Sequence, residues 1–154
     1  MVEVSDQKLP GFQAQMIAAG CYVEVNGRIL LIQQGLQKMH EGKWGVPGGK
    51  VEPNETLEEA ATRELLEETS IAVPSSNMTH VATLYCREAG HDFEFCLFQI
   101  KLDHEPPVHL SFEHIAYQWV NIATFTSLPL PLRPGADKAW RYYLQATDRS
   151  ALLI

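Results

Sequence analysis

Alternating apolar and polar positions divide much of the chain into short strands. An apolar, β-prone run over residues 15–25 and a second over 28–33 flank Asn26-Gly27, the dipeptide that most strongly favours a two-residue hairpin turn. The same patterns predict further extended segments at 46–51, 79–87, 93–102 and 116–120, with a turn at 88–92. Residues 1–12 are expected to form a loose arm.

Two other stretches have helical periodicity. Thr56 is a good N-cap residue, Glu59 completes a capping box, and good helix formers continue to Glu68 without Gly or Pro. A second helix is predicted near the C-terminal end, where apolar side chains recur at helical spacing: Ala136, Ala139, Trp140, Tyr143 and Leu144. Strands on both sides of a central helix, followed by a terminal helix, predict an α/β protein with a mixed sheet between helices.

The first of these helices places charge where apolar side chains are expected. Its apolar stripe, which should face the core, consists of Leu57, Ala60, Ala61 and Leu65. Glu64 and Glu68 fall in the middle of that stripe, and Glu67 lies at its edge. Carboxylates on a burying face repel one another and lose hydration, and a hard cation that prefers oxygen ligands is the simplest compensation. Arg63, four residues from Glu59 and from Glu67, cannot serve all three acids and is expected to tie the helix to its surroundings.

The alternative is a solvated acidic face, which is what charge runs usually form. Residues 55–68 hold six glutamates and one arginine, and so account for most of the net charge of −7. The positions of Glu64 and Glu68 argue against that alternative, as does the preceding sequence KWGVPGG at 43–49. Its glycine pair allows backbone conformations that other residues resist, so that main-chain groups can approach a ligand.

The stretch from Gly49 to Ile71 resembles the signature of the Nudix hydrolase family. That signature is Gly, five residues, Glu, seven residues, Arg-Glu, an aliphatic residue, any residue, Glu-Glu, any residue, Gly and an aliphatic residue. The matching positions here are Gly49, Glu55, Arg63, Glu64, Leu65, Glu67, Glu68 and Ile71. The family's upstream Trp-x-x-Pro-Gly-Gly is matched by Trp44, Pro47, Gly48 and Gly49. The one departure is Ser70, where the family has Gly.

The resemblance implies an α/β/α sandwich of the Nudix type, with a mixed curved sheet between helices, formed as one domain by the whole chain of 154 residues. It implies that Glu64, Glu67 and Glu68 bind Mg²⁺, for which Mn²⁺ could substitute, with the Gly49 carbonyl as a candidate further ligand. Ser70 is expected just past the helix end, where glycine permits a left-handed cap. A serine there should cost on the order of 1 kcal/mol, which puts the helix exit in question but not the metal ligands.

A second acidic position lies outside the signature. Glu113 is followed by His114, Tyr117 and Trp119, and this segment resembles one found in the family's dinucleoside polyphosphate hydrolases. Glu113 could supply a further metal ligand, position the attacking water, or be a solvated loop residue.

Candidate substrate contacts fall into three groups. The first could reach phosphates, although such side chains are more often solvated surface charges: Arg28, Lys38 and Lys43. The second could stack on a base, although alternation also suits them to strand packing: Tyr85, Phe93 and Phe95. The third would offer main-chain groups to the substrate: Gly48 and Gly49.

Composition narrows the class of partner. A net charge of −7 and a pI near 5.3 argue against a nucleic-acid polymer, although a bound metal can reverse the local field for a small nucleotide. No apolar run reaches membrane-spanning length, and the first ten residues lack the features of a signal peptide. Cys21, Cys86 and Cys96 have no metal-site spacing and are expected to be buried free thiols in a reducing compartment. We therefore expect a cytoplasmic protein, monomeric or homodimeric, with a small nucleotide as its partner.

These features together predict a magnesium-dependent enzyme that hydrolyses a phosphoanhydride in a nucleoside diphosphate linked to another group. The metal would neutralise phosphate charge and lower the pKa of water, and Glu64 or Glu113 would accept the proton. Residues 83–86 lack the proline that family members acting on ADP-ribose often carry there. Nucleoside triphosphates, oxidised ones included, and dinucleoside polyphosphates both stay open as substrates. A nucleotide-binding module with the Nudix fold but without turnover is the non-catalytic alternative.

Overall fold

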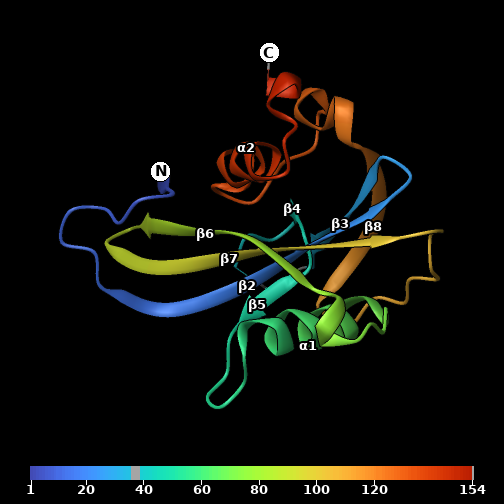
Figure 1. Cartoon of the computed structure of the whole chain (residues 1–154), viewed down its shortest axis with the longest axis horizontal. Coiled ribbons are helices and arrows are strands. Elements are labelled where there is room, and N and C mark those ends of the chain that lie inside the picture. Colours follow the sequence, from blue (N-terminus) through green and yellow to red (C-terminus); the bar gives the residue numbers. More distant parts are fainter. Residues whose placement is uncertain (36–38, 154) are drawn as a thin grey trace.

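An eight-stranded sheet lies between two α-helices in the computed structural model, which describes residues 1–35 and 39–153 (Figure 1). The strands are β1 (Val2–Ser5), β2 (Ala14–Val25), β3 (Arg28–Gln34), β4 (Trp44–Gly45), β5 (Gly48–Lys50), β6 (Thr79–Glu88), β7 (His91–Leu102) and β8 (His114–Asn121). The helices are α1 (Leu57–Thr69) and α2 (Ala136–Ala146), with short 3-10 turns at Ser75–Asn77, Ile122–Ser127 and Ser150–Leu153. Because α1 and α2 cover opposite faces of the sheet, the predicted α/β/α sandwich is confirmed.

The sheet is mixed, as predicted. Its strand order is β1-β6-β7-β2-β3-β4, with β5 joined to β2 and β8 joined to β3. β2 and β7 run parallel, whereas the other pairs are antiparallel. β2 meets β3 only at Glu24 and Val25, next to the hairpin turn, and pairs with β5 through Ala18–Gly20. The two long strands therefore diverge away from the turn, and β5 takes the place beside β2 that β3 has left.

Each face of the sheet has its own apolar core. On one face, Ala60, Ala61 and Leu65 of α1 pack against side chains from β2, β3 and β7. On the other face, the buried aromatic side chains of α2 pack on the sheet, where Tyr22 stacks on Tyr143 with ring centroids 3.9 Å apart. The apolar stripe predicted for the first helix is therefore buried as expected.

Local sequence signals set several element boundaries as predicted. Asn26 and Gly27 both have positive φ angles, 49° and 79°, as a type I′ hairpin turn requires. Thr56 accepts a hydrogen bond from the N–H of Glu59, and the Glu59 side chain accepts one from the N–H of Thr56, which confirms the capping box. Ser70 has a φ of 65°, the left-handed conformation predicted for the helix exit.

The loose arm expected at the N-terminus is wrong for Val2–Ser5. These residues form β1, which pairs antiparallel with the far end of β6. Val2 is buried, and its carbonyl accepts a hydrogen bond from Nζ of Lys138 at 2.8 Å. Val2–Ser5 alternate between apolar and polar side chains, but a segment this short becomes a strand only through its partners in β6, which are distant in the chain.

Two strands are longer than predicted. β7 begins at His91, so the turn before it shrinks from 88–92 to Ala89-Gly90, both with positive φ. β8 extends beyond the predicted 116–120 at both ends because it pairs with β3 along its whole length. Its partner strand, and not its own composition, sets its boundaries.

The three cysteines are free and buried, as predicted. Across residues 1–35 and 39–153, no helix is both long enough and apolar enough to cross a bilayer.

Candidate active site

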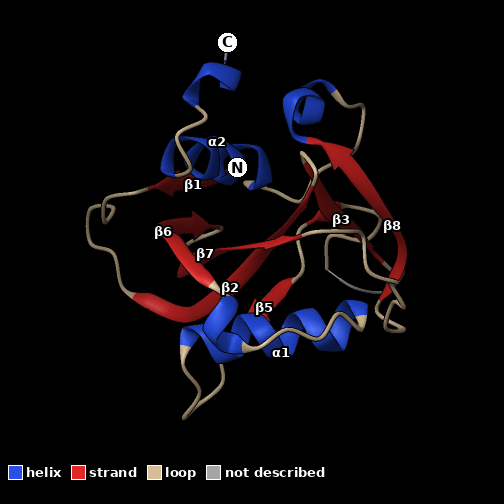
Figure 2. Cartoon of the chain, turned by 45° about the vertical axis from the view of Figure 1, so that its right-hand side comes forward, coloured by secondary structure: helices blue, strands red, loops and turns tan. Residues whose placement is uncertain are grey.

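α1 holds its acidic side chains against the glycine pair of β5, and Figure 2 shows the helix lying alongside that strand. The N–H of Gly48 donates to Oε1 of Glu68 at 2.8 Å. A Cβ at Gly49 would lie 2.6 Å from the carboxyl carbon of Glu64, and one at Gly48 would lie 2.8 Å from Cα of Gly20. Neither glycine of the pair has a positive φ. The pair is therefore needed for room between the chains, and not for the unusual backbone conformation that we expected.

Two of the three clustered acids are removed from solvent. The side chains of Glu64 and Glu68 are 14% and 12% exposed, whereas that of Glu67 is 58% exposed. Burial raises the pKa of Glu68 to about 8, and the neighbouring charge of Glu64 adds to the effect. Burial also raises the pKa of Glu64, against the opposing effect of its hydrogen bond with Arg63. The helix therefore presents two carboxylates in surroundings that favour the neutral form or a bound cation.

Arg63 ties the helix to the loop before it. Its guanidinium donates to both carboxylate oxygens of Glu55, at 3.0 and 2.7 Å, and to the carbonyl of Lys50 at 3.0 Å. It also reaches two acids of the cluster, Glu64 at 2.9 Å and Glu67 at 3.3 Å. The Glu59 side chain, four residues before Arg63, closes the capping box with the N–H of Thr56.

The clustered carboxylates make their hydrogen bonds with protein groups. In the described part of the chain, no three His, Cys, Asp or Glu side chains converge as a ready metal shell. Glu64 and Glu67 turn toward Arg63, and Glu68 turns toward the N–H of Gly48. The donor set nevertheless fits a hard divalent cation, because such ions prefer carboxylate oxygens and a buried acid with a raised pKa lacks a full counter-charge.

The segment before β8 crosses the C-terminal end of α1. Its main chain bonds to the last turn of the helix through two N–H groups, that of His109 to the Thr69 carbonyl at 2.9 Å and that of Ser111 to the Glu68 carbonyl at 3.2 Å. The carbonyl of Glu113 accepts from the N–H of Gly35 at 2.8 Å. The charge of Glu113 also contributes to the raised pKa of both Glu64 and Glu68. Glu113 is therefore brought within electrostatic reach of the acidic cluster.

Comparison with known proteins identifies the family. The NUDIX domain model matches residues 14–143. The chain belongs to the Nudix family. It is 33% identical over 116 residues to the CTP pyrophosphohydrolase of Escherichia coli (strain K12), covering 73% of this chain and 79% of that one. It is 44% identical over 77 residues to the 8-oxo-dGTP diphosphatase of Proteus vulgaris, covering 50% of this chain and 62% of that one.

Solved structures agree on the Nudix fold. The MutT protein from Methanosarcina mazei Go1 superposes with a TM-score of 0.72 at 24% identity, covering 87% of this chain and 95% of that one. The family resemblance inferred from Gly49 to Ile71 is thus confirmed. The protein is a Nudix hydrolase of nucleoside diphosphate-linked compounds, and members of this family use divalent metal ions.

Arg133 is a charged residue near the Nudix signature that sequence patterns did not indicate. Its run of prolines and leucines pairs with Trp44, whose N–H donates to the Pro131 carbonyl and whose carbonyl accepts from the N–H of Arg133, both at 2.8 Å. The Arg133 side chain lies over Gly45, where a Cβ would be 2.8 Å from Cδ of Arg133. Its charge acts to lower the pKa of Glu68. The contact joins residues almost ninety positions apart, so no local pattern could reveal it.

His114 also lies beside the Nudix acids. It is buried, with Nε2 3.9 Å from Oε2 of Glu68. The sequence marked it only as the neighbour of Glu113 in a motif. Its position on the first residue of β8 directs it toward α1 because that strand begins at the end of the helix.

The basic residues predicted to reach phosphates are not all near the Nudix signature. Arg28 begins β3 at the hairpin turn, at the opposite end of the strand from Gln34, and pairs with Glu105 at 3.1 Å. Arg28 thus lies in a surface ion pair, and its contact with phosphates stays a prediction. Lys43 lies next to β4, where its carbonyl accepts from the N–H of Gln34 at 2.8 Å, and stays a candidate. Lys38 lies outside the described residues.

Of the three aromatic side chains predicted to stack on a base, Phe93 and Phe95 pack against the α2 core, and Tyr85 lies on the opposite face of the sheet. Phe95 is opposite Leu84 and faces the α2 core, and its ring fills the space where a Cβ at Gly20 would be. Tyr85 is the next residue along β6 and packs edge-on against Phe12, with ring centroids 5.3 Å apart. Because neighbours in a strand point to opposite faces, Tyr85 cannot line the same pocket as Phe95.

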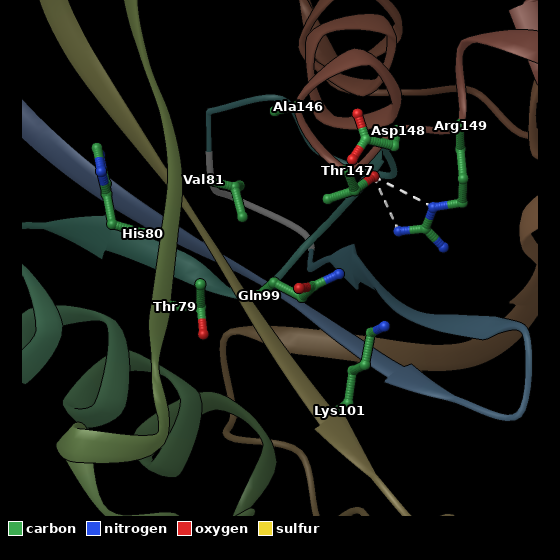
Figure 3. Close-up of a pocket in the computed structure, with 9 residues that line it drawn as sticks. All are labelled: Thr79, His80, Val81, Gln99, Lys101, Ala146, Thr147, Asp148 and Arg149. Atoms are coloured by element: carbon green, nitrogen blue, oxygen red, sulfur yellow. Dashed lines mark hydrogen bonds between the residues drawn. The ribbon is translucent and has the colours of Figure 1, made fainter.

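A cavity of about 430 Å³ lies beside the C-terminal end of α2, and Figure 3 shows the side chains that line it. Its lining comes from β6, β7 and the end of α2: Thr79, His80, Val81, Gln99, Lys101, Ala146, Thr147, Asp148 and Arg149. Arg149 donates to the Thr147 hydroxyl, as the dashed lines in Figure 3 show, and pairs with the buried Glu24 at 2.6 Å. The charge of Arg149 is thus matched by the Glu24 carboxylate, and the formal charges of Lys101 and Asp148 in the lining cancel, so this cavity carries no net positive charge for phosphates.

Proposed function

We propose that this Nudix hydrolase is a magnesium-dependent pyrophosphohydrolase of nucleoside triphosphates, unmodified or oxidised. The observation that carries the proposal is the pair of buried acids, Glu64 and Glu68, packed against Gly48 and Gly49 with the exposed Glu67 beside them. The substrate class is supported by two relatives whose names specify nucleoside triphosphates, a CTP pyrophosphohydrolase and an 8-oxo-dGTP diphosphatase.

The proposed magnesium ligands are Glu64, Glu67 and Glu68, with the Gly49 carbonyl as a further candidate. Bound there, Mg²⁺ supplies neutralisation of the phosphate charges and acidification of water. Without a cation, the triphosphate would be repelled by the same acids, because like charges interact strongly where solvent is excluded. Mn²⁺ accepts the same oxygen donors and should substitute for Mg²⁺.

Glu113 is the residue we assign to orienting the water and accepting its proton. Glu64 already carries a hydrogen bond from Arg63 and lies against Gly49, which suits it to a fixed ligand position. Glu113 comes from a different element and adds its charge to the same cluster. The water oxygen would bond to one phosphorus of the anhydride that joins the α- and β-phosphates, and that phosphorus would lose its bond to the bridging oxygen. The products would be a nucleoside monophosphate and pyrophosphate. Positioning and charge neutralisation are the main requirements of this chemistry.

The base and phosphates need contacts beyond the acids. Phe95 is the best placed of the three aromatic candidates, because its ring lies at Gly20, which is paired with Gly48. Lys43 and Arg133 both lie beside Trp44. Lys43 precedes it in the chain, and Arg133 belongs to the segment that pairs with it. We assign Phe95 to the base and the two cations to the phosphates.

A panel of nucleotides with product analysis tests the function. Nucleoside triphosphates should release pyrophosphate in a reaction that requires Mg²⁺, and Glu68→Gln should lower turnover by two or more orders of magnitude while the protein stays folded. Glu105→Gln, an exposed acid paired with Arg28, is the matched control and should keep wild-type turnover. Activity undiminished by EDTA would overturn the metal assignment. Preference for a dinucleoside polyphosphate would overturn only the substrate assignment.

The assignment of the proton acceptor has its own test. Glu113→Gln should reduce turnover about 100-fold or more with little change in KM, the size typical of a lost general base. Should Glu64 accept the proton instead, Glu64→Gln would be nearly inactive and Glu113→Gln nearly normal. Measuring both variants at saturating Mg²⁺ separates the two cases.

A further inference from the structure

The exit of α1 differs chemically from that of the family signature. Ser70 occupies the position of the signature's glycine, adopts the left-handed conformation with φ 65° and ψ 14°, and donates its N–H to the Leu66 carbonyl at 2.9 Å. Its hydroxyl donates to the carbonyl of His109 at 2.9 Å. A glycine would fit this backbone without strain but could not make the second bond.

The residue that Ser70 contacts begins a short path to Glu113. From His109 onward the segment is held against α1 by the two main-chain bonds described above, which end at Ser111. The Ser111 hydroxyl in turn accepts from the N–H of Glu113 at 3.4 Å. On the other side, the N–H of Gly35 holds the Glu113 carbonyl. The connection between β7 and β8 thus passes beside the end of α1 (Figure 1) and is fastened there at several points.

We propose that Ser70 is a positioning residue whose hydroxyl fixes segment 109–113 on the end of α1 and so holds Glu113 over Glu64 and Glu68. The inference rests on the proposed function, because it needs Glu113 to act on the water. The bond from the Ser70 hydroxyl to the His109 carbonyl comes from a side chain, whereas the His109 and Ser111 N–H bonds to the helix end come from the main chain. Removing it loosens the segment without changing any acid of the cluster.

Two substitutions separate positioning from stability. Ser70→Ala removes the hydroxyl and keeps a side chain in the left-handed conformation, whereas Ser70→Gly removes both. We expect both to lower kcat by roughly 3- to 10-fold with KM unchanged, since a misplaced catalytic group loses rate quickly. Their melting temperatures should differ, with Ser70→Gly the more stable of the two. If the two variants lose kcat equally although their melting temperatures differ, positioning by the hydroxyl is supported. If the variant with the lower melting temperature also loses more kcat, the proposal is overturned.

Hydrogen exchange supplies a measurement that does not depend on turnover. The amides of His109 and Ser111 should exchange faster in Ser70→Ala than in the wild type, because their bonds to the helix end open more often once the hydroxyl is gone. Ser76→Ala, an exposed serine in the next turn, is the matched control and should leave these amides unchanged. Unchanged exchange in Ser70→Ala overturns the proposal.

A double-mutant cycle decides whether Ser70 acts through Glu113. In a Glu113→Gln background, adding Ser70→Ala should change kcat by less than about two-fold, because the group being positioned is already lost. Full additivity of the two losses overturns the proposal. A wild-type protein with no metal-dependent hydrolysis of any nucleotide would defeat the proposed function itself. An active wild type with a fully active Ser70→Ala defeats only this inference.

Discussion

Replacing Glu68 by Gln should stabilise the metal-free protein. Glutamine keeps the shape of the side chain and an oxygen that can accept from the N–H of Gly48, the bond that Glu68 makes at 2.8 Å. What it removes is a carboxyl group that is 12% exposed and whose pKa is raised to about 8 by burial. The variant therefore isolates the free energy of placing this charge on the buried face of α1.

The sign and size follow from proton linkage. Below the ordinary pKa of 4.5 the Glu68 carboxyl is protonated in both states, and its contribution to folding is fully favourable. As the pH rises from 4.5 to about 8, the unfolded chain ionises while the folded protein keeps the proton, so the free energy of unfolding falls. At about 1.4 kcal/mol for each pKa unit, the full loss would be roughly 5 kcal/mol. Relaxation and water entry around a buried charge reduce such penalties, and we expect roughly 2–4 kcal/mol.

Chemical and thermal unfolding in EDTA between pH 5 and pH 9 provide the assay. Wild type and Glu68→Gln should be nearly equal near pH 5 and should diverge as the pH rises, with the variant higher in melting temperature by roughly 5–15 °C at pH 9. Adding Mg²⁺ should raise the wild-type melting temperature by mass action and leave Glu68→Gln almost unchanged. The matched control is Glu67→Gln, which removes a charge from a side chain that is 58% exposed. It should change metal-free stability by no more than about 0.5 kcal/mol.

Two outcomes would refute this reasoning. Superimposable unfolding curves for wild type and Glu68→Gln at pH 9 in EDTA would mean that burial of the carboxylate carries no penalty. An equal gain in Glu67→Gln would mean that relief of general helix repulsion, and not desolvation of Glu68, explains the effect.

Three further predictions concern neighbouring positions. Gly49→Ala places a Cβ about 2.6 Å from the Glu64 carboxyl carbon, so turnover should fall at least about 10-fold while circular dichroism shows an unchanged fold. Arg63→Lys cannot reproduce the two-pronged bond to Glu55 together with the bond to the Lys50 carbonyl, and urea unfolding should show a loss of about 1–2 kcal/mol. Arg133→Gln should raise the KM for a nucleoside triphosphate several-fold with kcat within about two-fold of wild type, and an unchanged KM would remove Arg133 from the substrate contacts.

Features fixed by neighbours in the chain could be predicted from the sequence. The capping box of Thr56 and Glu59, the left-handed Ser70 and the Asn26-Gly27 turn each depend on residues a few positions apart. The conflict between acids and apolar residues on α1 is local in the same sense, because helical geometry alone places them on one face. The pKa of Glu68, which burial raises to about 8, shows how strongly the buried face disfavours the ionised acid.

Features fixed by distant partners could not be predicted. β1 is held by β6, and Arg133 reaches the Gly45 region only because its segment pairs with Trp44. The faces of Tyr85 and Phe95 depend on the register between β6 and β7, in which Leu84 opposes Phe95. A change of one residue in that register would have placed the two rings on the same face, so composition could not assign their faces.

The pairing of β3 with β8 has a consequence for the kinetics of folding. Leu31 lies opposite Gln118, so this strand pair closes a loop of 87 residues, and β1 with β6 closes one of similar length. Such distant contacts form slowly, whereas α1 and the Asn26-Gly27 hairpin can form early. Glu113 stands just before β8 and joins the acids of α1 only when that strand docks. A cation that needs the assembled cluster therefore binds after the main barrier, so Mg²⁺ should slow unfolding and leave the refolding rate nearly unchanged.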